Sequence, residues 1–421
     1  MAVQIERLPS GLCVVSDSMP HLETASIGCW VNAGARYESI QDNGISHVLE
    51  HMAFKGTELR SSRAIAEEVE AVGGYLNAYT SAEHTAYFAR VLRNDISLAV
   101  DLLADILQFS TFNEGELARE RQVILQEIAQ TRDTPDDIIF DHFQSTAYPN
   151  QALGRSILGT VENVQGFCSG QLRSYMEKYY HGDRMVLCGA GAVDHDVFVR
   201  LVDDAFHRIP GCVDETPEPA LYHGGAYREH RDLEQLHLLI GFEGVGYHDP
   251  DYYAAQVYST ILGGGMSSRL FQEVREKRGL AYSVYTFGNS YTDSGVFGIY
   301  AATDPNEVST LVPVVCEEIC KLSDLVREEE VLRAHNQLKA GLMMSLESSM
   351  SRCEQLGRQL LIYGRVLDTE ELLKNIDSVD CTSVIRVGNK ITSASPVLAA
   401  LGPIEKLETY DQVQERLPVE L

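Results

Sequence analysis

Basic residues are scarce in this sequence. It has 34 Lys and Arg against 61 Asp and Glu, which gives a formal net charge of -27 at pH 7. General binding to nucleic acids depends on basic patches that neutralise phosphates, so the composition argues against this class of function. The acidic excess is explained by solubility, and part of it could also draw in basic peptides, because a cleft of one sign concentrates the opposite charge.

Long apolar runs and targeting segments are also missing. No run approaches the roughly 18 to 20 apolar residues that a membrane-spanning helix needs. The start, MAVQIERLPSGLCVV, has neither the basic and then apolar regions of a signal peptide nor the Arg- and Ser-rich composition of a transit peptide. We therefore expect no membrane span and a cytoplasmic protein, or a mature form whose targeting segment is gone.

The cysteines form no CxxC pair. They are Cys13, Cys29, Cys168, Cys188, Cys212, Cys316, Cys320, Cys353 and Cys381. Their odd number and irregular spacing argue against a disulfide framework and for a reducing compartment.

The length and the order of elements predict two domains. A chain of 421 residues is too long for one ordinary core. The elements expected in the first half are two short strands (5–19), a third strand (24–34), helices from about 46 and over 61–72, a hairpin (73–92), and helices over 96–108 and 114–132.

This order recurs in the second half. HLLIGFEGVGYHDPDYYAAQVYSTILGGG (237–265) mirrors ASIGCWVNAGARYESIQDNGISHVLEHMAFKG (25–56), a strand, an acidic turn and a helix. EVREKRGLAYSVYTF (273–287) mirrors EVEAVGGYLNAYTS (68–81). Such internal repetition predicts two similar α+β units of about 200 residues, each a mixed or antiparallel sheet packed with helices.

The predicted domain boundaries follow from the repeat. Residues 1–209 form a first domain, residues 236–421 a second, and the polar, Pro-containing stretch 210–235 joins them.

The segment NGISHVLEHMAFKGT (43–57) places three polar residues on one face of a predicted helix. At 100° per residue, His47, Glu50 and His51 fall within about 100° of one another, and the apolar residues lie opposite. Two imidazoles one turn apart can share a metal, and the glutamate between them can reach a water molecule there. The alternative is a solvated polar face or core histidines, but HxxEH arises rarely by chance and is the inverzincin signature.

The repeat makes the two halves chemically unequal. Its alignment puts Gln256, Ser259 and Thr260 opposite the three HxxEH residues. Only the first half therefore carries a metal motif, and the second half is expected to be non-catalytic.

Two histidines leave a catalytic zinc one protein ligand short. The helix expected over 114–132 offers Glu120 and Glu127, which are seven residues apart and lie on nearly the same face. From the residues alone, both could point at one site, or both could be solvated charges between Arg119 and Arg121.

At this point the sequence resembles the pitrilysin/insulinase inverzincin metallopeptidases, most of all the subunits of about 400 residues that include the β subunit of mitochondrial processing peptidase and its bacterial relatives. The matching motifs are GISHVLEHMAFKGT, GGYLNAYTSAEHTAYFARVL, ERQVILQEI, DTPDDIIFDHF, LGRSILGT and REKRGLAYSVYT. The resemblance implies that Glu127, 76 residues after His51, joins His47 and His51 as a ligand of one Zn²⁺ per chain. It also implies that Glu50 is the general base and that Glu120 orients a ligand.

The resemblance further implies substrate contacts. YLNAYTS resembles an edge strand on which the substrate lies as an added β-strand, with Asn77 and Ala78 as contacts, although an ordinary hairpin strand has the same composition. Asp137 and Asp141, expected one turn apart on a continuation of the helix 114–132, match acidic positions that recognise an arginine shortly before the cleavage site. An aspartate replaces a glutamate at the first position, and an acidic surface turn is the alternative.

The second half matches at Arg275 and Tyr282, an Arg/Tyr pair that hydrogen-bonds the substrate carbonyl in this family. In this family two such chains, or one doubled chain, form a clam-shell around a chamber, so one chain is expected to supply half of it. The pair is then expected to act in trans, across a homodimer or a heterodimer. The segment LGGGMSS (262–268) is either a flexible gate or a helix C-terminal turn.

The function expected from the sequence is a zinc endopeptidase that cleaves extended or presequence-like peptides, with a preference for arginine near the cut. A homodimer is favoured because one chain combines the metal motif with the Arg/Tyr pair. The alternatives are a non-catalytic scaffold, like the core subunits of respiratory complex III, and the catalytic subunit of an obligate heterodimer.

Overall fold

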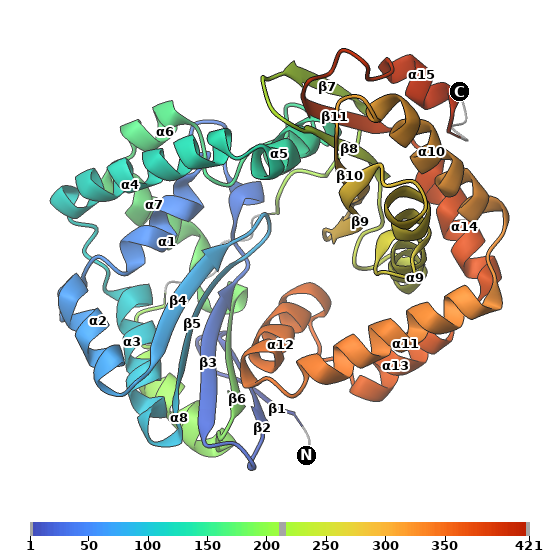
Figure 1. The fold of residues 1–421 in the computed structure, drawn as a ribbon. Helices are drawn as coiled ribbons and strands as arrows, with labels where there is room; N and C mark the ends of the chain where they lie inside the picture. Colours follow the sequence, from blue (N-terminus) through green and yellow to red (C-terminus); the bar gives the residue numbers. More distant parts are fainter. Residues whose placement is uncertain (1–2, 210–215, 418–421) are drawn as a thin grey trace. The chain divides into compact units, whose positions relative to one another are not determined.

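The computed structural model of the chain describes residues 3–209 and 216–417. The chain divides into two compact units, each described by itself (Figure 1). Unit 1 comprises Met1–Ala129, Arg155–Glu218 and Met343–Leu367, and unit 2 comprises Gln130–Gly154, Pro219–Leu342 and Asp368–Leu421. Each unit contains one mixed sheet packed with helices, so the predicted α+β fold of two similar halves is confirmed.

Unit 1 is built on a sheet with the strand order β1-β2-β6-β3-β5-β4. Its strands are β1 (Gln4–Arg7), β2 (Cys13–Ser18), β3 (Thr24–Val31), β4 (Tyr75–Thr80), β5 (Thr85–Leu92) and β6 (Met185–Gly191). Only β2 and β6 run parallel. The central strands β3 and β6 are apolar almost throughout because both of their faces are buried.

Helices cover both faces of this sheet (Figure 1). They are α1 (Ile45–Ala53), α2 (Ser62–Ala71), α3 (Ile96–Gln108), α4 (Glu114–Asp133), α6 (Val161–Gly166), α7 (Ser169–Tyr179), α8 (His195–Ala205) and α12 (Ser349–Tyr363). Helix α12 packs against Trp30, on the face away from α1 and α3. Gly357 allows this contact, since a Cβ there would lie 2.5 Å from the Trp30 ring.

Unit 2 repeats the topology of unit 1. Its strand order is β7-β11-β8-β10-β9, and only the pair β7–β11 is parallel. The strands are β7 (Gly225–His230), β8 (Leu236–Glu243), β9 (Ala281–Ser290), β10 (Gly295–Thr303) and β11 (Val397–Gly402). They correspond in order to β2, β3, β4, β5 and β6 of unit 1, so the sequence repeat reflects a repeated sheet, with β1 as an additional strand.

The helices of unit 2 also form two layers. They are α5 (Pro135–Ala147), α9 (Tyr252–Gly263), α10 (Val308–Asp324), α11 (Glu328–Ser345), α13 (Thr369–Asp377), α14 (Cys381–Thr392) and α15 (Tyr410–Glu415). Alternate residues of β8, such as Ile240 and Phe242, face the core with α9 and α14. Gly241 faces α5, where an added Cβ would lie 2.5 Å from the Phe143 ring.

The units differ from the domains 1–209 and 236–421 expected from the sequence. Helix α5 belongs to unit 2, because Ile138, Ile139 and Phe143 form an apolar face that packs on β8 and β11. Helix α12 belongs to unit 1, because Cys353 and Leu356 pack with Trp30. Each of these two helices thus belongs to the unit opposite to the one expected. The sequence repeat could not indicate this, since both segments are amphipathic helices at equivalent places in the order of elements.

The expected linker 210–235 is also partly structured. Residues 210–215, which include Cys212, lie outside the described residues. Gly225–His230 forms strand β7 at the edge of the second sheet. The eight described cysteines are all free. Within the described ranges, no helix combines the length and the apolar character needed to cross a membrane.

Candidate metal centre

Helix α1 is anchored at its N-terminus by a buried carboxylate. Gly44 begins the helix with φ 99° and has no side chain to cap it. Glu38 replaces the missing cap, since its carboxylate accepts hydrogen bonds from the N–H groups of Gly44 and Ser46, each at 2.8 Å. Gly44 also permits a close contact, because a Cβ there would lie 2.8 Å from the Cα of Gly159 in the LGRSILGT motif.

The two faces of α1 separate packing from chemistry. Ile45, Val48, Leu49 and Met52 are buried in the core of unit 1, as the helical pattern predicts. The HxxEH residues lie on the other face and remain partly accessible. The helix is therefore held rigidly by its apolar side while it presents its polar side.

Helix α4 brings Glu127 to the two histidines. The Glu127 Oε2 atom lies 3.7 Å from His47 Nε2 and 3.5 Å from His51 Nε2. One possible ligand atom from each residue lies within 4.8 Å of the others. Ligands about 2.0–2.1 Å from a tetrahedral zinc lie about 3.3 Å apart, so the donor set fits a zinc ion with small adjustments.

The state of His47 also suits a metal ligand. Its Nδ1 atom is buried and has no hydrogen-bond partner among the described residues, and its Nε2 atom is too far from Glu127 for a hydrogen bond. Burial, followed by the nearby His51 charge, lowers the pKa of His47 to about 4, so its imidazole is neutral at pH 7, as metal binding requires.

Glu50 lies beside the donor set and is tied to strand β4. The Thr80 hydroxyl donates a hydrogen bond of 2.6 Å to Glu50 Oε2. Burial raises the pKa of Glu50, and the hydrogen bonds from Thr80 oppose that rise. A raised carboxyl pKa brings a proton-transferring group closer to neutral pH.

Glu120 bridges a histidine and a lysine. Its Oε2 atom lies 3.1 Å from His51 Nδ1, and its Oε1 atom lies 2.6 Å from Lys55 Nζ. The Glu120 side chain is only 8% exposed, so it is not a solvated surface charge. A carboxylate in this place fixes the His51 ring so that its Nε2 faces Glu127.

Strand β4 is the terminal strand of the first sheet, as the resemblance implies. Asn77 is exposed and accepts a hydrogen bond of 2.9 Å from the N–H of Ala78, whose side chain is buried. This N–H is therefore held by a local side chain, which an added strand could displace.

Comparison with known proteins identifies the family of the chain. Residues 13–161 match the model of the insulinase family (peptidase family M16), and residues 169–338 match that of the peptidase M16 inactive domain. An uncharacterized zinc protease of Rickettsia felis is 41% identical over 400 residues, which cover 95% of this chain and 97% of the relative. The chain belongs to peptidase family M16.

Other M16 relatives agree with this assignment. The β subunit of the mouse mitochondrial-processing peptidase is 40% identical over 97% of this chain and 86% of its own length. Two solved structures share the fold: a protease from Helicobacter pylori (TM-score 0.89, 21% identity, covering 96% of this chain and 99% of that one) and a chain of complex III2 from Candida albicans (TM-score 0.87, 23% identity, covering 99% of each). The resemblance stated from the sequence motifs is thus confirmed.

The two acidic residues that M16 resemblance assigns to arginine recognition do not continue helix α4. Asp137 and Asp141 lie on α5, which belongs to unit 2, whereas the metal centre belongs to unit 1. Pro135 starts the new helix, and Thr134 before it is extended (φ -109°, ψ 97°), because the residue before a proline avoids the helical region. The two carboxylates are still one turn apart, on α5.

Arg275 and Tyr282 are neighbours within unit 2. Arg275 lies in the π-helical turn Phe271–Glu276, and its guanidinium carbon is 4.3 Å from the centre of the Tyr282 ring. Tyr282 lies on β9 and is 75% exposed. The guanidinium therefore stacks on a tyrosine whose side chain stays open to a ligand.

Helix α9 occupies the place of α1 in unit 2, but its polar residues serve the fold. Ser259 donates to Thr286 Oγ1 at 3.0 Å, and Thr260 donates to the carbonyl of Gln256 at 2.8 Å. The segment 262–268 contains the C-terminal turn of α9, one of the two alternatives expected for it. Gly263 allows the helix to approach β9, since a Cβ there would lie 2.7 Å from the Thr286 backbone nitrogen.

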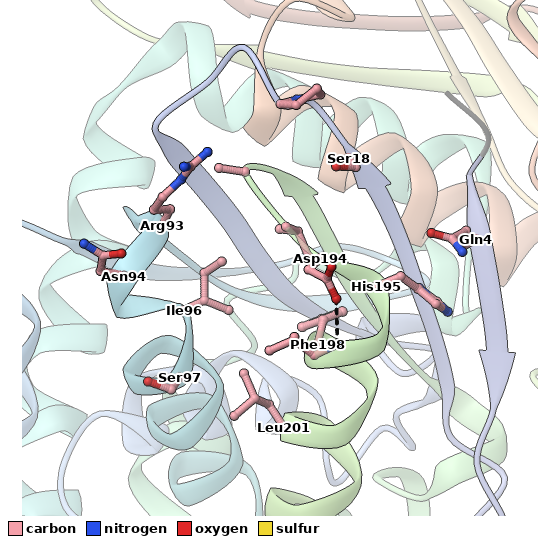
Figure 2. A pocket seen from close by; sticks show the side chains of 14 residues that line it. Gln4, Ser18, Arg93, Asn94, Ile96, Ser97, Asp194, His195, Phe198 and Leu201 are labelled. Atoms are coloured by element: carbon pink, nitrogen blue, oxygen red, sulfur yellow. Dashed lines mark hydrogen bonds between the residues drawn. The ribbon is translucent and has the colours of Figure 1, made fainter.

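Unit 1 also contains a hollow of about 600 Å³ between the ends of β1 and β2 and the starts of α3 and α8 (Figure 2). Two of its polar side chains have structural partners. Asp194 accepts a hydrogen bond of 3.0 Å from the N–H of Val197 at the start of α8, and His195 Nδ1 lies 2.8 Å from Ser16 Oγ. None of the residues assigned to the metal centre lines this hollow.

Sequence reasoning missed three residues that support the site: Glu38, Lys55 and Thr80. Lys55 and Thr80 lie inside the matched motifs MAFKGT and YLNAYTS, so their positions in those motifs were the available signal. Glu38 had no such signal, because a carboxylate that caps a helix from six residues before its N-cap does not follow the capping-box spacing.

Proposed function

We propose that the chain is a zinc-dependent endopeptidase that hydrolyses extended peptides. The observation that carries this proposal is the convergence of His47, His51 and Glu127 from two helices, with Glu50 beside them. Its membership of peptidase family M16 and its similarity to a zinc protease support the assignment.

His47, His51 and Glu127 would hold one zinc ion per chain, which when bound supplies a Lewis acid that polarises the scissile carbonyl and acidifies water. Glu50 takes the proton of the attacking water and delivers it to the leaving amine. Glu120 keeps the His51 ring in its binding orientation, since its carboxylate accepts a hydrogen bond from Nδ1–H.

The substrate would bind as an added strand at β4, beside Asn77 and Ala78. Backbone hydrogen bonds at a free sheet edge give affinity with little selection of side chains. Such binding requires an extended peptide, so folded proteins would be poor substrates. The enclosed chamber and the cytoplasmic location expected from the sequence belong to the same proposal.

Two groups in unit 2 would add selectivity and catalysis. Asp137 and Asp141 would bind an arginine near the cleavage site, and Arg275 and Tyr282 would hydrogen-bond the substrate carbonyl as negative charge develops on it. We place this second pair in trans, within a homodimer, because one chain carries every group. The match of residues 169–338 to an M16 inactive domain supports a non-catalytic second half. The mouse relative is named as the β subunit of a processing peptidase, so an obligate heterodimer is the competing assembly.

A non-catalytic scaffold is a weaker proposal. A scaffold has no need for two imidazoles and a carboxylate whose possible ligand atoms lie within 4.8 Å of one another, yet His47, His51 and Glu127 have this arrangement. The complete donor set and general base therefore favour the enzyme.

Digestion of a peptide library tests the proposed function. We expect the purified protein to contain one zinc per chain and to cleave unstructured peptides at internal bonds, as mapped by mass spectrometry. A chelator should abolish cleavage, and added zinc should restore it. Cleavage that survives complete removal of zinc would refute the proposal.

The specificity proposal makes a separate prediction. Replacement of both Asp137 and Asp141 by Asn should lower kcat/KM for peptides with arginine near the cut by about 10- to 100-fold, because charge-assisted hydrogen bonds of about 1.5–3 kcal/mol are lost. Peptides without arginine should be cleaved within about twofold of the wild-type rate. Asp411→Asn, at an acidic position in the first turn of α15, is a matched control. Equal losses for both kinds of peptide would refute arginine recognition by this pair.

A further inference from the structure

The general base and the substrate strand are joined by one side chain. Thr80 is the last residue of β4, and its hydroxyl donates a hydrogen bond of 2.6 Å to Oε2 of Glu50 on α1. Both side chains are partly buried, so water competes little for this bond. Among the described residues, Thr80 is the one whose side chain is hydrogen-bonded to the Glu50 carboxylate.

The alternation of β4 explains why Thr80 faces the site. Successive side chains of a strand point to opposite faces. Tyr79 contacts Trp30 Nε1 and Glu354 on α12, on one face of the sheet. Thr80 must therefore face α1, on the same side as the buried side chain of Ala78.

Threonine suits this task because its side chain is stiff. Two heavy atoms on its Cβ restrict χ1, so the hydroxyl is held in direction without a large loss of entropy. The opposite residue of the hairpin, Thr85, has a different role, since its hydroxyl donates to the carbonyl of Ala33 at 2.9 Å in the core. Thr80 and Thr85 are thus paired across the hairpin, but only the hydroxyl of Thr80 contacts the HxxEH motif.

We propose that Thr80 is a positioning residue for the general base. Its hydroxyl hydrogen-bonds to Oε2 of Glu50 and so fixes the direction in which this carboxylate faces the metal donor set. Strand β4 would then bind the peptide through its backbone and also fix the carboxylate of the general base through Thr80. Because it takes Glu50 as the general base, this proposal rests on the proposed function.

Its expected consequences separate catalysis from binding. Loss of the hydroxyl should let the Glu50 carboxylate rotate, and misplacement of a catalytic group by about 1 Å can cost about 100-fold in rate. We expect Thr80→Val to lower kcat by about 10- to 100-fold. The KM should stay within about threefold, because the backbone edge that binds the peptide is unchanged.

The test is a series of variants of the full chain: Thr80→Ser, Thr80→Val, Thr80→Ala and, as the matched control, Thr85→Val. We expect one zinc per chain in all of them, most of the wild-type kcat in Thr80→Ser, the same large loss in the Val and Ala variants, and unchanged kcat in Thr85→Val. The midpoint of thermal unfolding should fall in Thr85→Val, which loses a buried hydrogen bond. A crystal structure of Thr80→Val should show Glu50 in a rotamer different from that of the wild type.

Two results would overturn the inference: a kcat of Thr80→Val within twofold of the wild type, or a Thr80→Ser variant as slow as Thr80→Val. Either result leaves the proposed function intact if Glu50→Gln is inactive. Full activity of Glu50→Gln would instead remove the general base, and the role of Thr80 with it.

Discussion

Glu50→Gln is expected to abolish peptide hydrolysis while the protein keeps its zinc. General acid–base catalysis contributes about 10²- to 10⁴-fold, and an amide of the same size cannot accept the proton of water. In the wild type the Thr80 hydroxyl donates a hydrogen bond of 2.6 Å to Oε2 of Glu50. The amide oxygen of Gln can accept the same hydrogen bond, so the local packing should be kept. We therefore expect kcat to fall by at least about 1,000-fold, with the peptide still bound.

The measurement combines peptide kinetics with metal analysis. Glu67→Gln is the matched control, because Glu67 is an exposed glutamate on α2 whose partner is Arg63, four residues away. It should be fully active, since surface pairs of this kind contribute little. Full activity of Glu50→Gln would show that Glu50 is not the general base, and loss of zinc from it would show that its role is in binding the metal.

The sequence predicted the helices and strands of this fold well because the spacing of apolar residues indicates each of them. The hairpin over 73–92 and the helices over 96–108 and 114–132 have the bounds of β4, β5, α3 and α4 within a few residues. The repeat predicted a second α+β unit like the first, and the second sheet has the strand order of the first without β1. These features depend on local patterns that each half carries in its own sequence.

What the sequence did not predict depends on contacts between distant segments. The exchange of α5 and α12 between the units follows from which apolar face fits which sheet, and Gly357 against Trp30 shows how specific that fit is. Pro135 could have indicated that α4 ends before Asp137, since a proline with an extended residue before it interrupts a helix. The capping carboxylate of Glu38 needed a tertiary structure to be found.

The candidate metal centre was predictable for a different reason. His47, Glu50 and His51 share a helix face by spacing alone, but Glu120 and Glu127 could not be assigned from their spacing. The structure separates the two glutamates by their contacts: Glu127 faces both Nε2 atoms, and Glu120 faces Nδ1 of His51 and Lys55. Resemblance suggested the roles, and the different contacts of the two glutamates are the reason that we propose different roles for them.

Complementation between two inactive variants is the second large expected effect. Tyr282→Phe removes a hydroxyl proposed to stabilise developing negative charge, and loss of one such donor costs about 10²- to 10³-fold in kcat. Glu50→Gln is inactive for a different reason. If Tyr282 acts across a homodimer, a mixed dimer has one site with Glu50 from one chain and Tyr282 from the other, both intact.

Co-expression of the two variants with different affinity tags yields this mixed dimer, and light scattering checks its mass. One of its two sites is complete, so we expect about half of the wild-type kcat per dimer, which is about 50 to 500 times that of the Tyr282→Phe parent. A Tyr282→Phe chain paired with a doubly substituted Glu50→Gln, Tyr282→Phe chain is the control, and it should stay inactive. If Tyr282 instead acts within its own chain, every site of the mixed dimer lacks one group and activity cannot exceed that of the parents. A monomeric chain with full activity would exclude the homodimer altogether. The comparison therefore distinguishes a self-sufficient homodimer from both alternatives, because only a site shared by two copies of this chain can recover what each copy has lost.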